Sequence, residues 1–259
     1  MTTANPAGGA AGRGRLAALV PIAAFLAFLL LYEALRDLVE PATMTAALDH
    51  ARQVIDAERS LGLFVEPDVH AFVNGNGVLR FLTTWFYALA YTGGFILFFV
   101  WLWLRRRGNF WFVFAWFWAT NLIAVVGYWL YPLAPPRLSG LGLEGTTESA
   151  IKLGGSMKWF EPFRNEVAAM PSMHVGQSVF FALALTLLLT SRWRWLWWIW
   201  PAVMLVTVMA TANHYWMDGI GGAVCVALGL GAATLLARPI GLRAPWSREK
   251  APVPAGAPA

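Results

Sequence analysis

Long apolar runs, separated by short polar segments, divide the chain. Each run approaches the roughly 20 residues that an α-helix needs to cross the hydrocarbon core of a bilayer. The runs are continuous rather than alternating, which excludes strands as the membrane-spanning element. They are Leu16–Tyr32, Phe81–Leu104, Phe110–Leu130, Val175–Thr190, Trp195–Ala210 and Tyr215–Ala237. We therefore predict an all-α, polytopic membrane protein with six transmembrane helices.

The composition agrees with this class, because 58% of the 259 residues are hydrophobic and only 13% are charged. Such a balance does not describe a soluble globular domain. We expect one membrane domain over residues 15–240, between disordered cytoplasmic tails at 1–14 and 241–259 that are rich in Ala, Gly and Pro. An alternative for the first run is a signal peptide, although no small-residue cleavage site follows it.

One polar segment, Thr43–Leu61, has apolar residues at helical spacing and charged residues opposite them. This pattern predicts an amphipathic helix that lies on the outer leaflet. Glu58 falls in the middle of its apolar face. It is either a buried salt-bridge partner near a functional site or an ordinary carboxylate at the frayed end of the helix, next to Gly62.

Basic residues are distributed unequally between the two sets of connecting segments. If the N-terminus is cytoplasmic, the inner segments carry most of the arginines and only one acid, Glu249. The positive-inside bias then places both termini in the cytoplasm of a cell-membrane protein. The net charge of +5 follows from this topology, and we expect no nucleic-acid partner. The inner basic residues are Arg13, Arg15, Arg105, Arg106, Arg107, Arg192, Arg194, Arg238, Arg243, Arg248 and Lys250.

Three polar clusters stand at the ends of apolar runs: Pro135-Pro136-Arg137, Pro171-Ser172-Met173-His174 and His214 to Asp218. The predicted topology brings all three to the extracytoplasmic face, which favours one composite site there. Ionisable side chains at membrane depth are costly and are functional by default.

His214 and Asp218 are four residues apart, so a helix places them on one face. Asp218 can then accept the Nδ1 proton and leave Nε2 of His214 free as a nucleophile or base. A purely structural histidine, satisfied by the aspartate at a helix start, is the simpler alternative. Pro171 and Ser172 suit a helix start, where Ser172 caps the helix and backbone N–H groups can bind an anion near His174.

Two other classes of protein remain possible on these residues. His174, His214 and Asp218 could hold a catalytic zinc ion in a membrane hydrolase, although no His-Glu-x-x-His element or cysteine pair is present. A non-catalytic lipid carrier or transporter is the second alternative, but its polar groups should lie within the spans rather than at their ends.

At these residues the chain resembles the type 2 phosphatidic acid phosphatase superfamily. Pro171-Ser172-Met173-His174 matches its Pro-Ser-x-His signature, and His214 with Asp218 matches its last signature. The resemblance runs from about Phe81 to Ala237. It implies a phosphatase or phosphotransferase of lipid phosphates or phospholipids that works among membrane lipids without metal or cofactor. His214 would form a phosphohistidine, His174 would serve as acid and base, and Arg137 with backbone N–H groups near Ser172 would bind phosphate.

The chain also departs from the family pattern. Leu130 stands where a lysine is usual, and Thr207 and Val208 replace a Ser-Arg pair. The Pro-Pro-Arg, Pro-Ser-x-His and Asn-His-Tyr combination looks more like the divergent branch that includes the inositol phosphorylceramide synthases. Replacement phosphate contacts are expected from Asn213 or from the outer-loop cations Arg164, Lys158 and Lys152.

Overall fold

The computed structural model describes residues 20–28, 30–32, 34, 35, 44–87, 91–146 and 167–246. The predicted tail residues 1–14 and 247–259 lie outside these ranges. Within the described ranges every regular element is a helix and no strand is formed, as predicted. The nearest approach to a sheet is an isolated bridge between Leu133 and Ala168.

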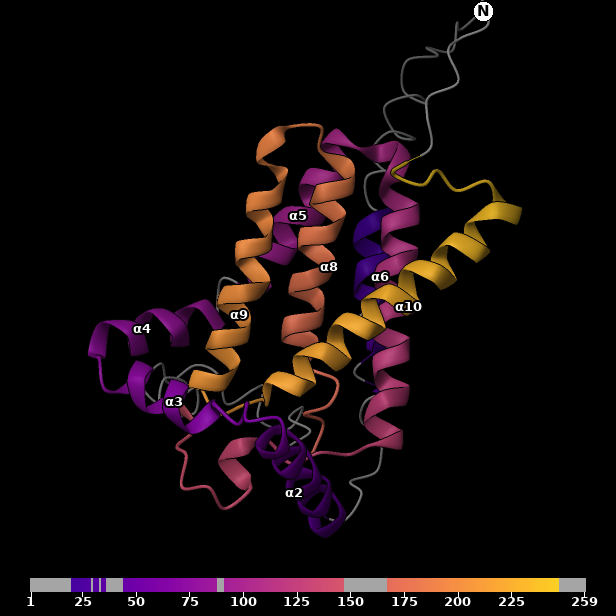
Figure 1. Ribbon diagram of the computed structural model, residues 1–259. Coiled ribbons are helices and arrows are strands. Elements are labelled where there is room, and N and C mark those ends of the chain that lie inside the picture. The colour runs from indigo at the N-terminus through magenta and orange to yellow at the C-terminus, as the bar shows by residue number, and fades with distance from the viewer. Residues whose placement is uncertain are drawn as a thin grey trace, which may run out of the picture.

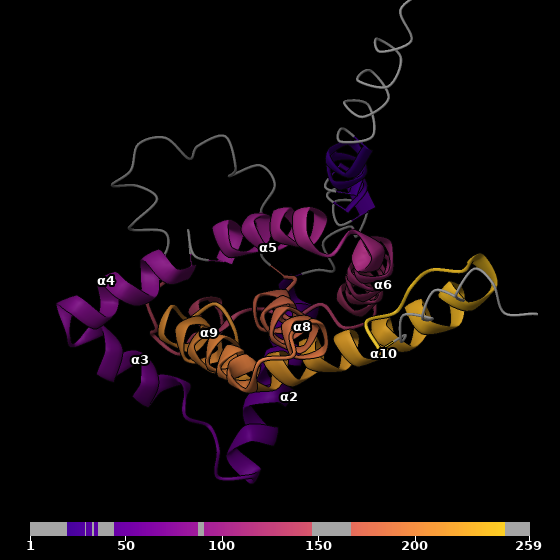
Figure 2. The same ribbon diagram turned by 90° about the horizontal axis from the view of Figure 1, so that it is seen from above.

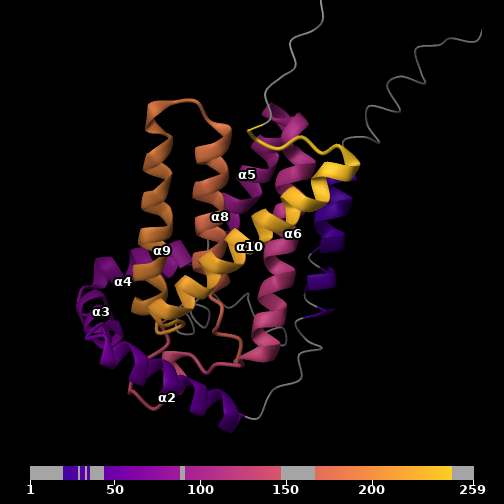
Figure 3. The ribbon, with the colours of Figure 1, turned by 45° about the vertical axis from the view of Figure 1, so that its right-hand side comes forward.

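The helices form an upright group with a peripheral set at one end (Figure 1). Helices α6, α8 and α9 stand side by side, and α10 crosses them obliquely (Figures 1 and 3). Helices α2, α3 and α4 lie around the end where α8 and α10 begin. The elements are α2 Met44–Ser60, α3 Glu66–Asn74, α4 Gly77–Trp85, α5 Tyr91–Arg105, α6 Arg107–Leu130, η2 Pro136–Leu138, α8 Met173–Leu188, η4 Arg192–Trp198, α9 Ile199–Ala210 and α10 Trp216–Ile240.

Two helices of the described chain, α6 and α10, are long and apolar enough to cross a membrane. Of the other predicted spans, Val175–Thr190 corresponds to the single, shorter helix α8. The run Phe81–Leu104 contains the end of α4 and most of α5, and the run Trp195–Ala210 begins in the 3₁₀ helix η4. The described residues of the first run, from Val20 to Phe28 and from Leu30 to Tyr32, are helical. The number of six spans therefore stays a prediction.

The upright helices pack through an aromatic core. Phe99 of α5, Phe117 of α6 and Phe180 of α8 are buried against one another. The Trp116 side chain donates a hydrogen bond from Nε1 to the Val226 carbonyl of α10 at 2.9 Å, which satisfies the one polar group of a fully buried indole. Seen from above in Figure 2, α5, α6, α8 and α10 surround this core.

Glycines allow α8 and α10 to touch along their backbones. A Cβ built on Gly222 of α10 would lie 2.3 Å from the Ser172 carbonyl oxygen and 3.0 Å from Cα of Gly176 in α8. Only a residue without a side chain permits this approach. The contact fixes the spacing between the two helix starts, and these starts carry the residues of the second and third polar clusters.

The predicted amphipathic helix coincides with α2. Its apolar residues, with Ala47, Ala51, Val54 and Ile55 fully or nearly buried, pack against the protein itself. Their neighbours include Leu133 and the ring of Tyr215. The first residues of the predicted C-terminal tail also pack, since Trp246 lies edge-on to Phe112 with ring centroids 5.3 Å apart.

Candidate active site

The three polar clusters meet at one end of the helix group. The starts of α8 and α10, the end of α9 and the loop with η2 converge there (Figure 1). The rings of His174 and His214 lie 5.6 Å apart, centroid to centroid, at an interplanar angle of 54°. Arg137 is joined to the same place by its backbone, whose N–H donates to the Ala212 carbonyl at 3.1 Å. The structure thus brings together residues that are far apart in sequence.

The Nδ1 atom of His214 has a different first partner from the one expected. It lies 2.9 Å from the carbonyl oxygen of Ala169 and 3.4 Å from Oδ2 of Asp218. A carbonyl oxygen only accepts, so Nδ1 carries the proton and Nε2 is left as the basic nitrogen. Asp218 Oδ2 also accepts the Tyr215 backbone N–H at 3.0 Å. Asp218 therefore makes a second, longer contact with Nδ1, in addition to the hydrogen bond with Ala169.

The electrostatic surroundings keep His214 neutral. Its pKa is lowered to about 4, chiefly by burial; the hydrogen bond with Ala169 acts in the opposite direction, and the positive charge of Arg137 also lowers the pKa. A neutral imidazole with a free Nε2 is the form that can attack an electrophile at physiological pH.

His174 lies in the first turn of α8, which begins at a cis Met170-Pro171 peptide. Its ring is stacked on Tyr87, with centroids 4.3 Å apart. The Ser172 hydroxyl caps the helix by accepting the Val175 N–H at 3.5 Å. The Ser172 N–H donates to the Asp218 carbonyl at 2.8 Å, which ties the start of α8 to the first turn of α10. The phosphate contact of backbone N–H groups near Ser172 stays a prediction.

Asn213 orients Arg137. Its Oδ1 accepts a hydrogen bond from Arg137 Nη1 at 2.7 Å, and its Nδ2 donates to the Thr211 hydroxyl at 2.9 Å. An amide held at both ends fixes the plane of the guanidinium group. The predicted contact of Asn213 with phosphate stays a prediction, and the structure shows in addition its hydrogen bond to Arg137. The other expected cations, Arg164, Lys158 and Lys152, lie outside the described residues.

Four residues near the site are not among the predicted catalytic or phosphate-binding residues. Ala169 contributes a backbone carbonyl, which has no sequence signature. Tyr87 lies inside an apolar run, where an aromatic residue is unremarkable. Glu66 and Glu58 are both fully buried and accept backbone N–H groups of the first turn of α10. Only Glu58 carried a signal, its place on the apolar face of α2. It is buried near the site, as one of its two interpretations proposed, although its partners are backbone and acidic groups.

The arrangement suits phosphoryl chemistry better than metal binding. Among the described residues, no three His, Cys, Asp or Glu side chains are grouped so that they could hold a metal ion. Two imidazoles and a guanidinium group are the side-chain types that can serve as nucleophile, proton carrier and clamp for anionic oxygens.

Comparison with known proteins agrees with the motifs. A family model described as the PAP2 superfamily matches residues 52–232. The matched segment contains Arg137, His174, His214 and Asp218 and covers more than half of the chain. Searches of curated proteins and of solved structures give no significant match. The extent of the family match shows that the chain belongs to the PAP2 superfamily.

Proposed function

We propose that the protein is a membrane-embedded, metal-independent lipid phosphatase or phosphotransferase that works through a phosphohistidine at His214. Superfamily membership supports phosphatase or phosphotransferase activity. The observation that carries the proposal is the pairing of the two histidines, 5.6 Å apart, with Nδ1 of His214 held by Ala169. A structural histidine would need the same hydrogen bond but not a second imidazole facing it.

The first half of the proposed reaction breaks the bond between phosphorus and the lipid oxygen. Nε2 of His214 attacks phosphorus in line, and the new P–N bond forms as the P–O bond breaks. His174 takes up a proton when the anionic phosphate binds beside it and donates this proton to the leaving oxygen. The phosphorylated His214 ring keeps its proton on Nδ1 and donates it in the hydrogen bond to the Ala169 carbonyl. The nearby Asp218 carboxyl group stabilises the ring.

The second half returns both histidines to their starting forms. The neutral His174 takes a proton from water or from an alcohol, whose oxygen attacks phosphorus as the P–N bond breaks. Arg137, held by Asn213, stabilises the negative charge on the nonbridging oxygens in both steps. Water as acceptor gives hydrolysis, and an alcohol gives transfer.

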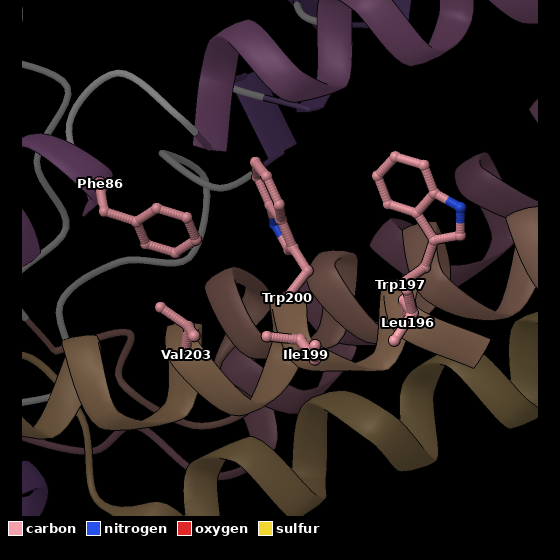
Figure 4. Close-up of a pocket in the computed structure, with 6 residues that line it drawn as sticks. All are labelled: Phe86, Leu196, Trp197, Ile199, Trp200 and Val203. Atoms are coloured by element: carbon pink, nitrogen blue, oxygen red, sulfur yellow. The ribbon is translucent and has the colours of Figure 1, made fainter. Parts of the chain in front are cut away.

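An apolar pocket between Phe86 and the start of α9, the end of α9 that points away from the histidines, supports a lipid substrate. It has a volume of about 300 Å³ and is lined by Phe86 together with Trp197, Trp200, Val203 and two further apolar residues of η4 and α9 (Figure 4). Phe86 precedes Tyr87, which stacks on His174. The hydrocarbon chain of a phosphate bound between the histidines would pass Tyr87 and Phe86 to reach this pocket.

The missing cations favour a diester donor over a monoester. A phosphate monoester carries nearly two negative charges at neutral pH and a diester carries one, so the loss of basic clamps harms the diester less. We propose headgroup transfer from a phospholipid such as a phosphatidylinositol, in line with the resemblance to the inositol phosphorylceramide synthases.

A competition assay tests the choice between transfer and hydrolysis. Purified protein in detergent is offered phosphatidic acid, an isoprenyl phosphate or phosphatidylinositol, each with and without a lipid alcohol, and products are identified by mass spectrometry. We expect an alcohol-dependent headgroup-transfer product from the diester, with the His214→Ala variant as the blank. Rapid phosphate release from the monoesters, with no transfer product from the diester, would make the protein a hydrolase of the usual kind.

We also propose that the site faces the extracytoplasmic side, with both termini in the cytoplasm. In a Cys225→Ala background, Glu144→Cys should react with a membrane-impermeant maleimide on intact cells, and Gly108→Cys should react only after lysis. Both positions are exposed in the structure, so access from solvent does not differ between them. Labelling of Gly108→Cys alone on intact cells would place the site on the cytoplasmic side.

The competing proposal is a non-catalytic lipid carrier. Its polar groups should lie in the middle of the helices that span the membrane. His174 and Asp218 instead lie in the first turns of α8 and α10, and His214 immediately precedes α10. This placement at helix ends favours an enzyme at the membrane boundary.

A further inference from the structure

Two glutamates from peripheral helices reach the first turn of α10. Glu66 of α3 accepts the Trp216 N–H at 2.9 Å, and Glu58 of α2 accepts the Met217 N–H at 3.2 Å. Asp218 accepts the preceding N–H, that of Tyr215, at 3.0 Å. Three successive backbone N–H groups, which a helix start leaves without partners, are thus each bound by a different carboxyl group.

The two glutamates also contact each other. Their carboxyl groups are close enough to influence each other's ionisation, and both side chains are completely buried. Two neighbouring buried carboxylates repel each other, which favours a proton on one of them. Burial and then the neighbouring charge of Glu66 raise the pKa of Glu58 to about 9, so Glu58 holds this proton at neutral pH.

Capping a helix with two buried glutamates costs more desolvation free energy than an ordinary cap does. A serine or asparagine at the start of α10 would satisfy the same N–H groups without burying two ionisable side chains. What the glutamates add is a connection between α10 and two other helices. The Trp216 indole strengthens it by donating to the Leu63 carbonyl, between α2 and α3, at 2.8 Å.

We infer that Glu58 and Glu66 are positioning residues that hold the first turn of α10, and with it the alignment of Asp218 and His214. The inference rests on the proposed function, because its effect is read from the reaction of His214. Asp218 lies 3.4 Å from Nδ1 of His214, so a small rotation of this turn moves the carboxylate out of reach and turns the imidazole away from its line of attack.

Substitutions at Glu66 distinguish the effect of side-chain length from the effect of an ionisable group. Glu66→Gln keeps an oxygen at the same distance for the Trp216 N–H but removes the ionisable group, whereas Glu66→Asp keeps the group and withdraws it by one methylene. We expect Glu66→Asp and Glu66→Ala to lower kcat by about tenfold or more with little change in KM, and Glu66→Gln to retain most activity. An active Glu66→Asp with an impaired Glu66→Gln would overturn positioning in favour of an electrostatic role.

The exposed acid of the same helix α2 provides the control. Asp49 forms a surface ion pair with Arg52, and Asp49→Ala should leave kcat unchanged, because such pairs contribute little. Glu58→Ala should lower kcat as Glu66→Ala does. Wild-type kcat in the Glu66→Asp and Glu58→Ala variants, measured per folded molecule, would refute the inference. If the alanine variants do not fold, the Asp and Gln pair at Glu66 decides alone.

The pH dependence of kcat gives an independent readout. Glu66 and Asp218 are the acidic groups that face Glu58, and the phenol of Tyr215 is also close to it. Below pH about 9 Glu58 is protonated and the pair is intact, whereas above it two buried negative charges repel each other. The wild-type enzyme should lose kcat as pH rises through this value, and Glu58→Gln should remove that loss. The same alkaline loss of kcat in the wild type and in Glu58→Gln would contradict the role of the Glu58 proton.

Hydrogen exchange distinguishes failure of this inference from failure of the proposed function. In Glu66→Ala, the amides of Tyr215, Trp216 and Met217 should exchange faster than in the wild type, while those in the middle of α10 stay protected. Faster exchange in a protein that turns over no lipid phosphate would retain the structural role and reject the enzyme. Unchanged exchange would reject the positioning role itself.

Discussion

Replacing His214 by alanine should reduce turnover by about a thousandfold or more, because it removes the group that we propose as the nucleophile. The expected intermediate is acid-labile and stable in alkali, as phosphohistidines are. It should be trapped from a ³²P-labelled donor in the wild type and be missing in His214→Ala. Turnover and trapping are both measured with the purified protein in detergent.

His70 supplies the matched control for this experiment. Its Nδ1 also bonds to a backbone carbonyl, that of Ala210, at 2.9 Å. His70→Ala therefore loses the same kind of hydrogen bond without losing a reacting nitrogen, and its activity should stay within about tenfold of wild type. Wild-type turnover by His214→Ala, or an equal loss in both variants, would contradict the role of His214 as nucleophile.

Replacing Gly222 by alanine should have the second large effect. The added Cβ would lie 2.3 Å from the Ser172 carbonyl oxygen, which is backbone and has no room to yield. Helix α8 must move away from α10, so the rings of His174 and His214 separate. We expect a loss of about 1–3 kcal/mol in stability and, because a shift of about 1 Å at a reacting centre costs on the order of 10²-fold, a similar fall in kcat.

Gly231→Ala is the control for Gly222→Ala. Both glycines lie within α10, but a Cβ on Gly231 meets nothing within 4 Å. Alanine favours helix over glycine by roughly 0.5–1 kcal/mol, so this variant should be as stable as the wild type or more so, with unchanged kcat. Unfolding temperature and turnover are measured for both. An unimpaired Gly222→Ala would show that the close contact of α8 with α10 does not set the distance between the histidines.

The residue types of the candidate site were visible in the sequence, because chemistry at the ends of apolar runs stands out. This signal identifies His174, His214, Asp218 and Arg137, and the fold brings their segments to one end. The exact partner of His214 was not predictable. The i, i+4 spacing favoured Asp218, yet the 2.9 Å contact is to Ala169, a carbonyl whose position depends on a loop that no local pattern describes.

The extent of the helices was harder to predict than their existence. Hydropathy treats Phe81–Leu104 as one run, but α4 ends at Trp85 and Tyr87 packs on His174. That contact depends on the start of α8, far along the chain, so no window of sequence contains it. The burial of Glu66 escaped prediction for the same reason. An acid in the first turn of α3 looks like ordinary compensation of the helix dipole.

The bonds from Glu66 to Trp216 and from Glu58 to Met217 join residues that are 150 and 159 positions apart. During synthesis, α2 and α3 leave the ribosome long before α10 exists. Until then their two carboxyl groups lack their helix partner, and water is the only good solvent for them. The peripheral helices can therefore dock in their final place only when the last long apolar helix arrives. A chain that stops before α10 lacks Asp218 and also has no partner for the carboxyl groups of α2 and α3. The synthesis of α10 therefore completes the candidate site and allows the peripheral helices to dock in one step.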